Sequence, residues 1–173
     1  MKETGILRRI DELGRIVIPK EIRKKLKIRE GDNLDIFVEE DSVILRKYSP
    51  LNDLETILEI LLDAVKRNYN NSIVVTDMNR IIASSKSEFP VGEDITEAFL
   101  GVINQKEEMQ INKNVSLEII PNVRTSQNLL IKPLLNYGDL FGVIVLFYEH
   151  DGFSNQQEQL ELIHQFCTEY ISI

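Results

Sequence analysis

The stretch Thr4–Leu26, TGILRRIDELGRIVIPKEIRKKL, determines how the first part of this chain folds. Aliphatic and β-branched residues lie on both sides of a central Leu13-Gly14 pair. Such residues favour extended backbone, and glycine favours a turn. We therefore predict strands over residues 5–10 and 15–18, with a turn at Leu13-Gly14 between them.

The residues that follow predict a short helix and a hairpin. Pro19 stops the second strand and suits the first turn of a helix, where its missing N–H is not needed. We place that helix over residues 20–27. Apolar and polar residues then alternate over residues 34–38 and 43–45, which predicts two strands around a turn at 39–42.

This first unit, residues 1–50, is small for an independent fold. Domains of about fifty residues bury little apolar surface alone and usually need a metal, disulfides or a partner chain. Residues 1–50 contain no cysteine and no cluster of metal-ligating side chains. We therefore predict an obligate homodimer whose hydrophobic core is shared between two chains.

Charge is divided unevenly along the chain, whose formal net charge is -8. Residues 1–29 hold ten basic and four acidic side chains, a net charge of +6, and five of the ten are arginines. Residues 51–173 hold eight basic and eighteen acidic side chains, a net charge of -10. This asymmetry indicates a basic binding module joined to an acidic domain. Because arginine can bind a phosphate or a guanine edge through two hydrogen bonds, we predict double-stranded DNA as a partner.

Residues 51–70 predict a connector helix with one apolar face. The cap is expected at Asn52 or Ser49. Two interpretations stay open: the helix packs on its own domain, or it joins two chains as a dimer-forming connector. The apolar residues that recur at helical spacing are Leu54, Ile57, Leu58, Leu61, Leu62 and Val65.

Residues 71–173 predict an α+β domain. Helices are expected over residues 95–103 and from a cap at Ser154 towards the C-terminus. A turn at residues 137–139 separates the last two strands. The predicted strands are 72–76, 80–84, 115–120, 129–135 and 141–148. Aromatic residues of this domain could line a pocket for a small-molecule effector, although aromatic residues at such spacings usually belong to a core. They are Phe89, Phe99, Tyr137, Phe141, Phe147 and Tyr148.

Catalytic and metal-binding patterns are weak throughout the chain. His164 and Cys167 lie three residues apart on the last predicted helix, but two ligands without a third make a poor zinc site. A buried thiol and a hydrogen-bonded histidine explain them better. His150-Asp151 has no nucleophile beside it in the sequence. We predict no enzyme activity, no cofactor and no metal.

The sequence also predicts a cytoplasmic protein with no membrane partner. No apolar run approaches the roughly 20 residues of a membrane span. A single cysteine fits a reducing compartment.

The stretch 4–26, its continuation Ile28-Arg29-Glu30-Gly31-Asp32 and the 34–47 hairpin closely resemble a known family. They resemble the swapped-hairpin DNA-binding domain of the AbrB transition-state regulators of spore-forming bacteria, without a gap over roughly the first fifty residues. The resemblance implies an interleaved dimer in which the hairpins of two chains complete one core. It also implies which residues contact DNA: Arg8, Arg15, Arg23 and Lys24.

The second half of the chain resembles a GAF domain more loosely. Lys132-Pro133-Leu134-Leu135 through Gly138, followed by 141–146, is similar to the closing hairpin of that fold. Residues 84–87 and 104–128 match no pattern. A swapped-hairpin domain followed by a connector helix and a GAF-like domain resembles the two-domain sporulation regulators of the AbrB family.

Three hypotheses about function follow. The first is a transcription regulator that binds DNA as a dimer or higher oligomer and senses a signal through its second domain. The second is an antitoxin of an addiction module, where the same domain type carries a toxin-binding tail. Such tails are usually short and disordered, whereas residues 51–173 are apolar enough to fold, which favours the regulator. The third keeps DNA binding and gives the second domain a role in oligomerisation alone.

Overall fold

The computed structural model describes residues 5–30, 32, 34–149 and 153–172, and the chain divides into two units after Tyr48. Gly31, His150 and Asp151, mentioned above, lie outside the described residues. Each unit has its own secondary structure, and the α+β class predicted for the chain applies to the second.

The first unit contains the predicted helix and hairpin. Helix α1 (Lys20–Lys25) begins directly after Pro19, whose carbonyl oxygen accepts a hydrogen bond of 2.9 Å from the Arg23 N–H. Strands β1 (Leu34–Glu39) and β2 (Ser42–Lys47) pair in antiparallel register. These predictions are confirmed.

The strands predicted over residues 5–10 and 15–18 are wrong for the single chain, because neither segment is a strand. A strand forms only where its backbone hydrogen-bonds to a neighbouring strand, and the described part of one chain places none beside them. The turn between them is confirmed. Gly14 has a φ of +75°, a value that glycine adopts readily.

The first unit carries its apolar side chains on its surface. Leu7 is 92% exposed, Val38 76% and Val17 73%, whereas Pro19 is the one buried residue among those described in this unit. Further exposed apolar residues are Ile10, Leu13, Ile16, Leu26, Ile36 and Val43. The described residues of a single copy of this unit therefore form no hydrophobic core.

A five-stranded antiparallel sheet forms the centre of the second unit, in the order β4-β3-β9-β8-β5. Strands β6 and β7 form a separate two-stranded sheet. The strands are β3 (Ser72–Asp77), β4 (Ile81–Ser84), β5 (Met109–Ile111), β6 (Leu117–Ile120), β7 (Val123–Thr125), β8 (Asn128–Asn136) and β9 (Asp139–Tyr148).

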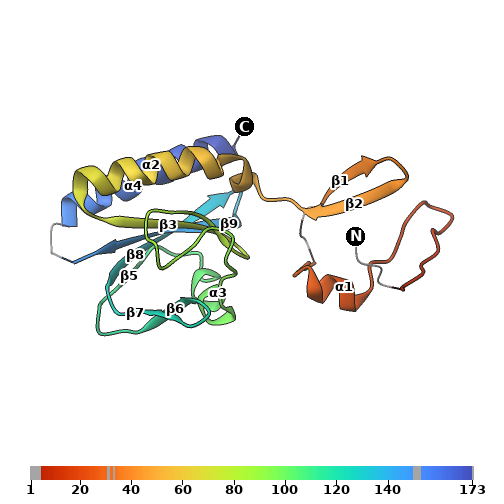
Figure 1. Ribbon diagram of the computed structural model, residues 1–173, viewed down its shortest axis with the longest axis horizontal. Helices are drawn as coiled ribbons and strands as arrows, with labels where there is room; N and C mark the ends of the chain where they lie inside the picture. The colour runs from red at the N-terminus through yellow and green to blue at the C-terminus, as the bar shows by residue number, and fades with distance from the viewer. Residues whose placement is uncertain (1–4, 31, 33, 150–152, 173) are drawn as a thin grey trace. The chain divides into compact units, whose positions relative to one another are not determined.

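Helices cover both faces of this sheet (Figure 1). The 3-10 turn η1 (Pro50–Leu54), helix α2 (Glu55–Tyr69) and helix α4 (Phe153–Ile171) pack on one face. Helix α3 (Glu97–Ile103) and the β6-β7 hairpin lie on the other.

Alternation along the strands gives this unit two apolar layers. In β9, Ile144 and Leu146 pack with α2 and α4, whereas Val145 and Phe147 pack with α3. Gly142 lets β9 approach β3 closely, since a Cβ atom there would lie 1.9 Å from the carbonyl oxygen of Thr76.

Helix α2 packs on its own unit, which is the first of the two interpretations given above. Leu58, Leu62 and Val65 are buried against the sheet. Complete burial of a leucine side chain contributes about 2 kcal/mol. Ile57 and Ile60 lie on the outward face of α2 and remain 51% and 68% exposed.

The predicted caps of α2 were wrong. Leu54 occupies the cap position, and no side chain caps either η1 or α2. Ser49 precedes η1 and Asn52 lies within it. The Glu55 N–H at the start of α2 bonds to the backbone carbonyl of Asn52, so neither side chain caps the helix. Ser154 likewise lies one residue inside α4, which begins at Phe153.

The remaining elements of the second unit follow the predicted ranges, with two omissions. The hairpin β8-β9 turns at Tyr137 and Gly138, both with positive φ. Strands β5 and β7 were missed because each has three residues, too few to show a period of two.

Candidate nucleic-acid interface

The turn over residues 11–15 holds Arg15 at the surface of the first unit. The Asp11 carboxylate accepts hydrogen bonds from the Leu13 N–H at 3.0 Å, the Arg15 N–H at 2.8 Å and Arg15 Nε at 2.8 Å. Two backbone hydrogen bonds of 3.0 Å close the turn, from Asp11 to Arg15 and from Gly14 to Asp11. The hydrogen bonds from the Arg15 backbone and guanidinium hold the pKa of Asp11 below its ordinary value.

Arg23 and Lys24 lie in the last turn of α1, a helix that buries no residue. Both side chains are exposed, and neither forms a hydrogen bond or an ion pair with another described residue. Cations are favoured at the C-terminal end of a helix, where the backbone carbonyls give negative potential. These two cations therefore remain available to an external anion.

Arg8 lies on the exposed segment before the turn. Its Nη1 donates a hydrogen bond of 3.0 Å to the carbonyl oxygen of Leu7, which leaves the rest of the guanidinium in solvent. All four predicted contact residues are thus exposed in one unit: Arg23 and Lys24 adjacent on α1, Arg8 and Arg15 on the segment before it. Exposed guanidinium and ammonium groups bind phosphate oxygens through charge-assisted hydrogen bonds.

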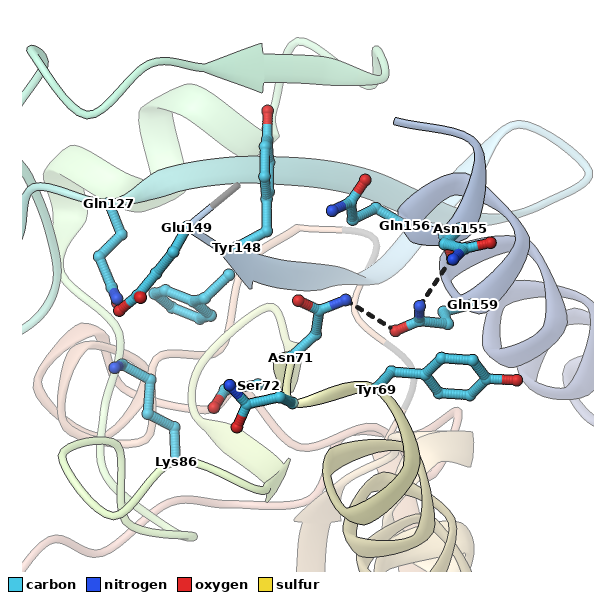
Figure 2. A pocket seen from close by; sticks show the side chains of 12 residues that line it. Tyr69, Asn71, Ser72, Lys86, Gln127, Tyr148, Glu149, Asn155, Gln156 and Gln159 are labelled. Atoms are coloured by element: carbon cyan, nitrogen blue, oxygen red, sulfur yellow. Dashed lines mark hydrogen bonds between the residues drawn. The ribbon is translucent and has the colours of Figure 1, made fainter. Parts of the chain in front are cut away.

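A polar cavity of about 470 Å³ opens at one end of the sheet in the second unit, where α2 ends and α4 begins (Figure 2). Asn71 Nδ2 donates a hydrogen bond of 3.0 Å to Gln159 Oε1, and Gln159 Nε2 donates one of 2.8 Å to the Asn155 carbonyl. The side chains of Gln127 and Glu149 border the same cavity and form no hydrogen bond with another described residue. Sequence reasoning missed this cavity because its amide residues come from segments far apart in the chain.

The aromatic residues proposed as a pocket lining have different roles. Phe89 and Phe99 are buried in the layer against α3, and Tyr137 is 99% exposed. Phe147 and Tyr148 do border the polar cavity. Lys86 also borders it, with Nζ 5.3 Å from the centre of the Phe147 ring and 3.2 Å from Glu88 Oε1.

His164 and Cys167 have the structural roles that the sequence predicted. The ring nitrogen Nε2 of His164 lies 3.1 Å from the carbonyl oxygen of Pro133. Burial, followed by the nearby Lys132 ammonium, lowers the pKa of His164. Burial also raises the pKa of the Cys167 thiol to about 12. The described residues contain no group of three or more side chains that could hold a metal ion.

In the described part of the chain, none of the helices combines the length and the apolar character that crossing a bilayer requires.

Comparison with known proteins finds similarity both in the first unit and beyond it. Residues 7–53 match the family described as "Antidote-toxin recognition MazE, bacterial antitoxin". Over 152 residues the chain is 38% identical to stage V sporulation protein T of Bacillus subtilis (strain 168), an alignment that covers 85% of each protein. The chain belongs to the stage V sporulation protein T family.

The N-terminal part is also similar to other members of the wider group. It is 47% identical over 66 residues to the transition state regulatory protein AbrB of the same organism, which covers 38% of this chain and 69% of AbrB. The solution structure of the N-domain of the transcription factor AbrB is 56% identical and covers 29% of this chain and 96% of that domain, with a TM-score of 0.28. The resemblance to the AbrB regulators is therefore confirmed at the level of sequence.

Proposed function

We propose that this protein is a DNA-binding transcription regulator of sporulation or transition-state genes. One observation carries the proposal: the first unit exposes arginine and lysine side chains within a segment that belongs to the AbrB-type family. The four contact residues are Arg8, Arg15, Arg23 and Lys24. Most of their contacts reach phosphates, which fix the position of the protein on the duplex, and fewer reach base edges.

DNA binding requires two chains, with the first units intertwined. The exposed apolar residues of the first unit support this assembly, because a second copy can bury them. Residues 5–10 and 15–18 then gain the strand partners that they lack in one chain. The alternating face of the hairpin, with Ile36 69% and Val38 76% exposed, supplies part of the shared core.

The second unit is a GAF-like domain that senses a small polar molecule. The cavity at the end of the sheet supports this role, because its volume is that of ordinary ligand sites and its amide groups can donate and accept hydrogen bonds. A ligand bound there raises the melting temperature of the wild-type chain by mass action. The variant Gln127→Leu, which removes a polar group from the wall, loses that rise. Oligomerisation alone is the competing role, and it is favoured if a broad set of metabolites leaves the melting temperature unchanged.

An antitoxin remains the second candidate, because the family matched by residues 7–53 contains bacterial antitoxins. The regulator is favoured because similarity to stage V sporulation protein T continues through the folded second unit. A toxin gene directly beside this one would favour the antitoxin.

Selection of bound duplexes from random oligonucleotides tests the main proposal. The wild-type chain is expected to enrich one family of sequences, and a variant carrying alanine at Arg8, Arg15 and Arg23 is expected to enrich none. Equal recovery of DNA by both proteins would overturn the proposed surface.

A further inference from the structure

The side chain of Asp11 is an unexpected feature of a surface that binds DNA. It is an acid within a unit of positive net charge, and it repels phosphate. It lies on the turn that carries a predicted DNA contact, Arg15. An acidic side chain at this place lowers the attraction to any duplex, whatever its sequence.

Stability of the turn does not account for the ion pair. The Arg15 side chain is 72% exposed and that of Asp11 42%, and ion pairs between exposed groups contribute little to folding. The backbone hydrogen bonds to Asp11 Oδ1 hold the turn, and a neutral asparagine could accept them equally well. Only the third bond, from Arg15 Nε to Oδ2, requires the second carboxylate oxygen.

That third bond fixes the direction of the guanidinium group. Only Nε of the Arg15 guanidinium bonds to the Asp11 carboxylate among the described residues, so the two terminal nitrogens keep N–H groups for an external partner while the plane of the guanidinium is held. A fork held in one orientation suits two parallel hydrogen bonds to a base edge, whereas a freely rotating cation suits any phosphate.

We infer that Asp11 is a positioning residue: it aligns Arg15 and so increases discrimination between DNA sequences while lowering overall affinity. This inference rests on the proposed DNA-binding function. It assigns to Asp11 a role in specificity that acts through Arg15, without direct contact between Asp11 and DNA.

The substitution Asp11→Asn separates positioning from simple charge. If Asp11 acted by charge alone, its removal would raise the affinity for every duplex by a similar factor. If Asp11 positions Arg15, the affinity for unrelated DNA rises, and the ratio of the affinity for the selected duplex to that for unrelated DNA falls. A bidentate base contact contributes roughly 5- to 150-fold to discrimination, and we expect a loss of about tenfold.

The next residue offers a matched control. Glu12 is exposed and forms no hydrogen bond or ion pair with another described residue. Glu12→Gln therefore removes the same charge one residue away without releasing Arg15. It is expected to raise affinity for all duplexes and to leave the ratio between selected and shuffled duplexes unchanged.

The experiment measures both affinities with the full-length wild type, Asp11→Asn and Glu12→Gln, each checked for an unchanged melting temperature. The NMR signal of the Arg15 Nε–H group in the free protein gives a second readout: it should shift in Asp11→Asn and stay in place in Glu12→Gln. In an Arg15→Ala background, Asp11→Asn should no longer change the ratio.

The outcomes are distinct. An unchanged ratio in Asp11→Asn, equal to that of Glu12→Gln, overturns the positioning role while DNA binding stands. An unshifted Arg15 signal overturns it as well, even if the variant binds DNA poorly. If the wild-type chain selects no duplex at all, the proposed function fails, and this inference fails with it.

Discussion

Replacing Arg23 by alanine should weaken binding to every DNA sequence and reduce its dependence on salt. The Arg23 side chain is exposed on α1 and has no partner among the described residues, so its charge is fully available to a phosphate. Because α1 buries no residue and alanine has the highest helix propensity, the change should leave the fold intact.

The magnitude follows from counterion release. Each phosphate contact contributes about -0.9 to the slope of log affinity against log salt. With Arg15 at a base edge, an intertwined pair presents three phosphate-binding cations from each chain and has an expected slope of about -5. Arg23→Ala removes one cation from each chain and should flatten the slope by about 1.8. The affinity ratio between wild type and variant should therefore shrink about tenfold between 50 and 200 mM salt.

Fluorescence anisotropy with one labelled duplex, repeated over this range of salt, measures the slope. Lys113→Ala is the control, since Lys113 is exposed in the acidic second unit and its side chain forms no hydrogen bond or ion pair with another described residue. Lys132 and Lys66 are less suitable, because Lys132 pairs with Glu108 and Glu161 and Lys66 donates to the Ser85 carbonyl. An unchanged slope in Arg23→Ala, with Arg8→Ala and Arg15→Ala equally silent, would refute the proposed surface.

Three further predictions concern assembly and stability. Val38→Asp should sediment as a monomer at micromolar concentration, because Val38 is exposed in one chain and would be buried in the pair. A variant that dimerises as tightly as the wild type contradicts the intertwined assembly. Since the pKa of His164 is lowered in the folded chain, the unfolded chain binds its proton first. Thermal stability should therefore fall as the pH drops through about 6.5, a dependence that His164→Gln reduces and that calorimetry measures. The Cys167 thiol, whose pKa burial raises to about 12, should react with iodoacetamide only as fast as the chain opens. Alkylation at the rate of a free thiol would show that the face of α4 that carries Cys167 is not packed on the sheet.

Elements with a clear period were predictable from the sequence. The hairpin over residues 34–47 and the strands β3, β4, β8 and β9 alternate or run apolar between obvious turns, and the structure places them within a few residues of the predicted ranges. The strands predicted over 5–10 and 15–18 failed for a different reason. Their residues favour extended backbone, but pairing depends on a neighbour that one chain does not provide.

The candidate sites also differed in how far the sequence could predict them. The exposed cations of the first unit were found because charge is visible in composition, and the wider family was visible in a local motif. The ion pair between Asp11 and Arg15 was missed, although a spacing of four residues around Gly14 is a signal for such a turn. The polar cavity is lined by residues about 90 positions apart in the sequence, such as Asn71 and Gln159. A local sequence pattern cannot predict that residues so far apart lie together.

The short link between the two units has a mechanical consequence. Strand β2 ends at Lys47 and η1 begins at Pro50, so Tyr48 and Ser49 alone lie between them. A link of this length spans about 10 Å at most. When two first units pair, they tether two second units at an effective concentration of about a millimolar or more. Contacts through the exposed face of Ile57 and Ile60 then need only a dissociation constant near that value to be half populated. Contacts this weak would not form between separate domains. In the tethered pair, a ligand that changes their dissociation constant tenfold would change the fraction of pairs in which they are formed.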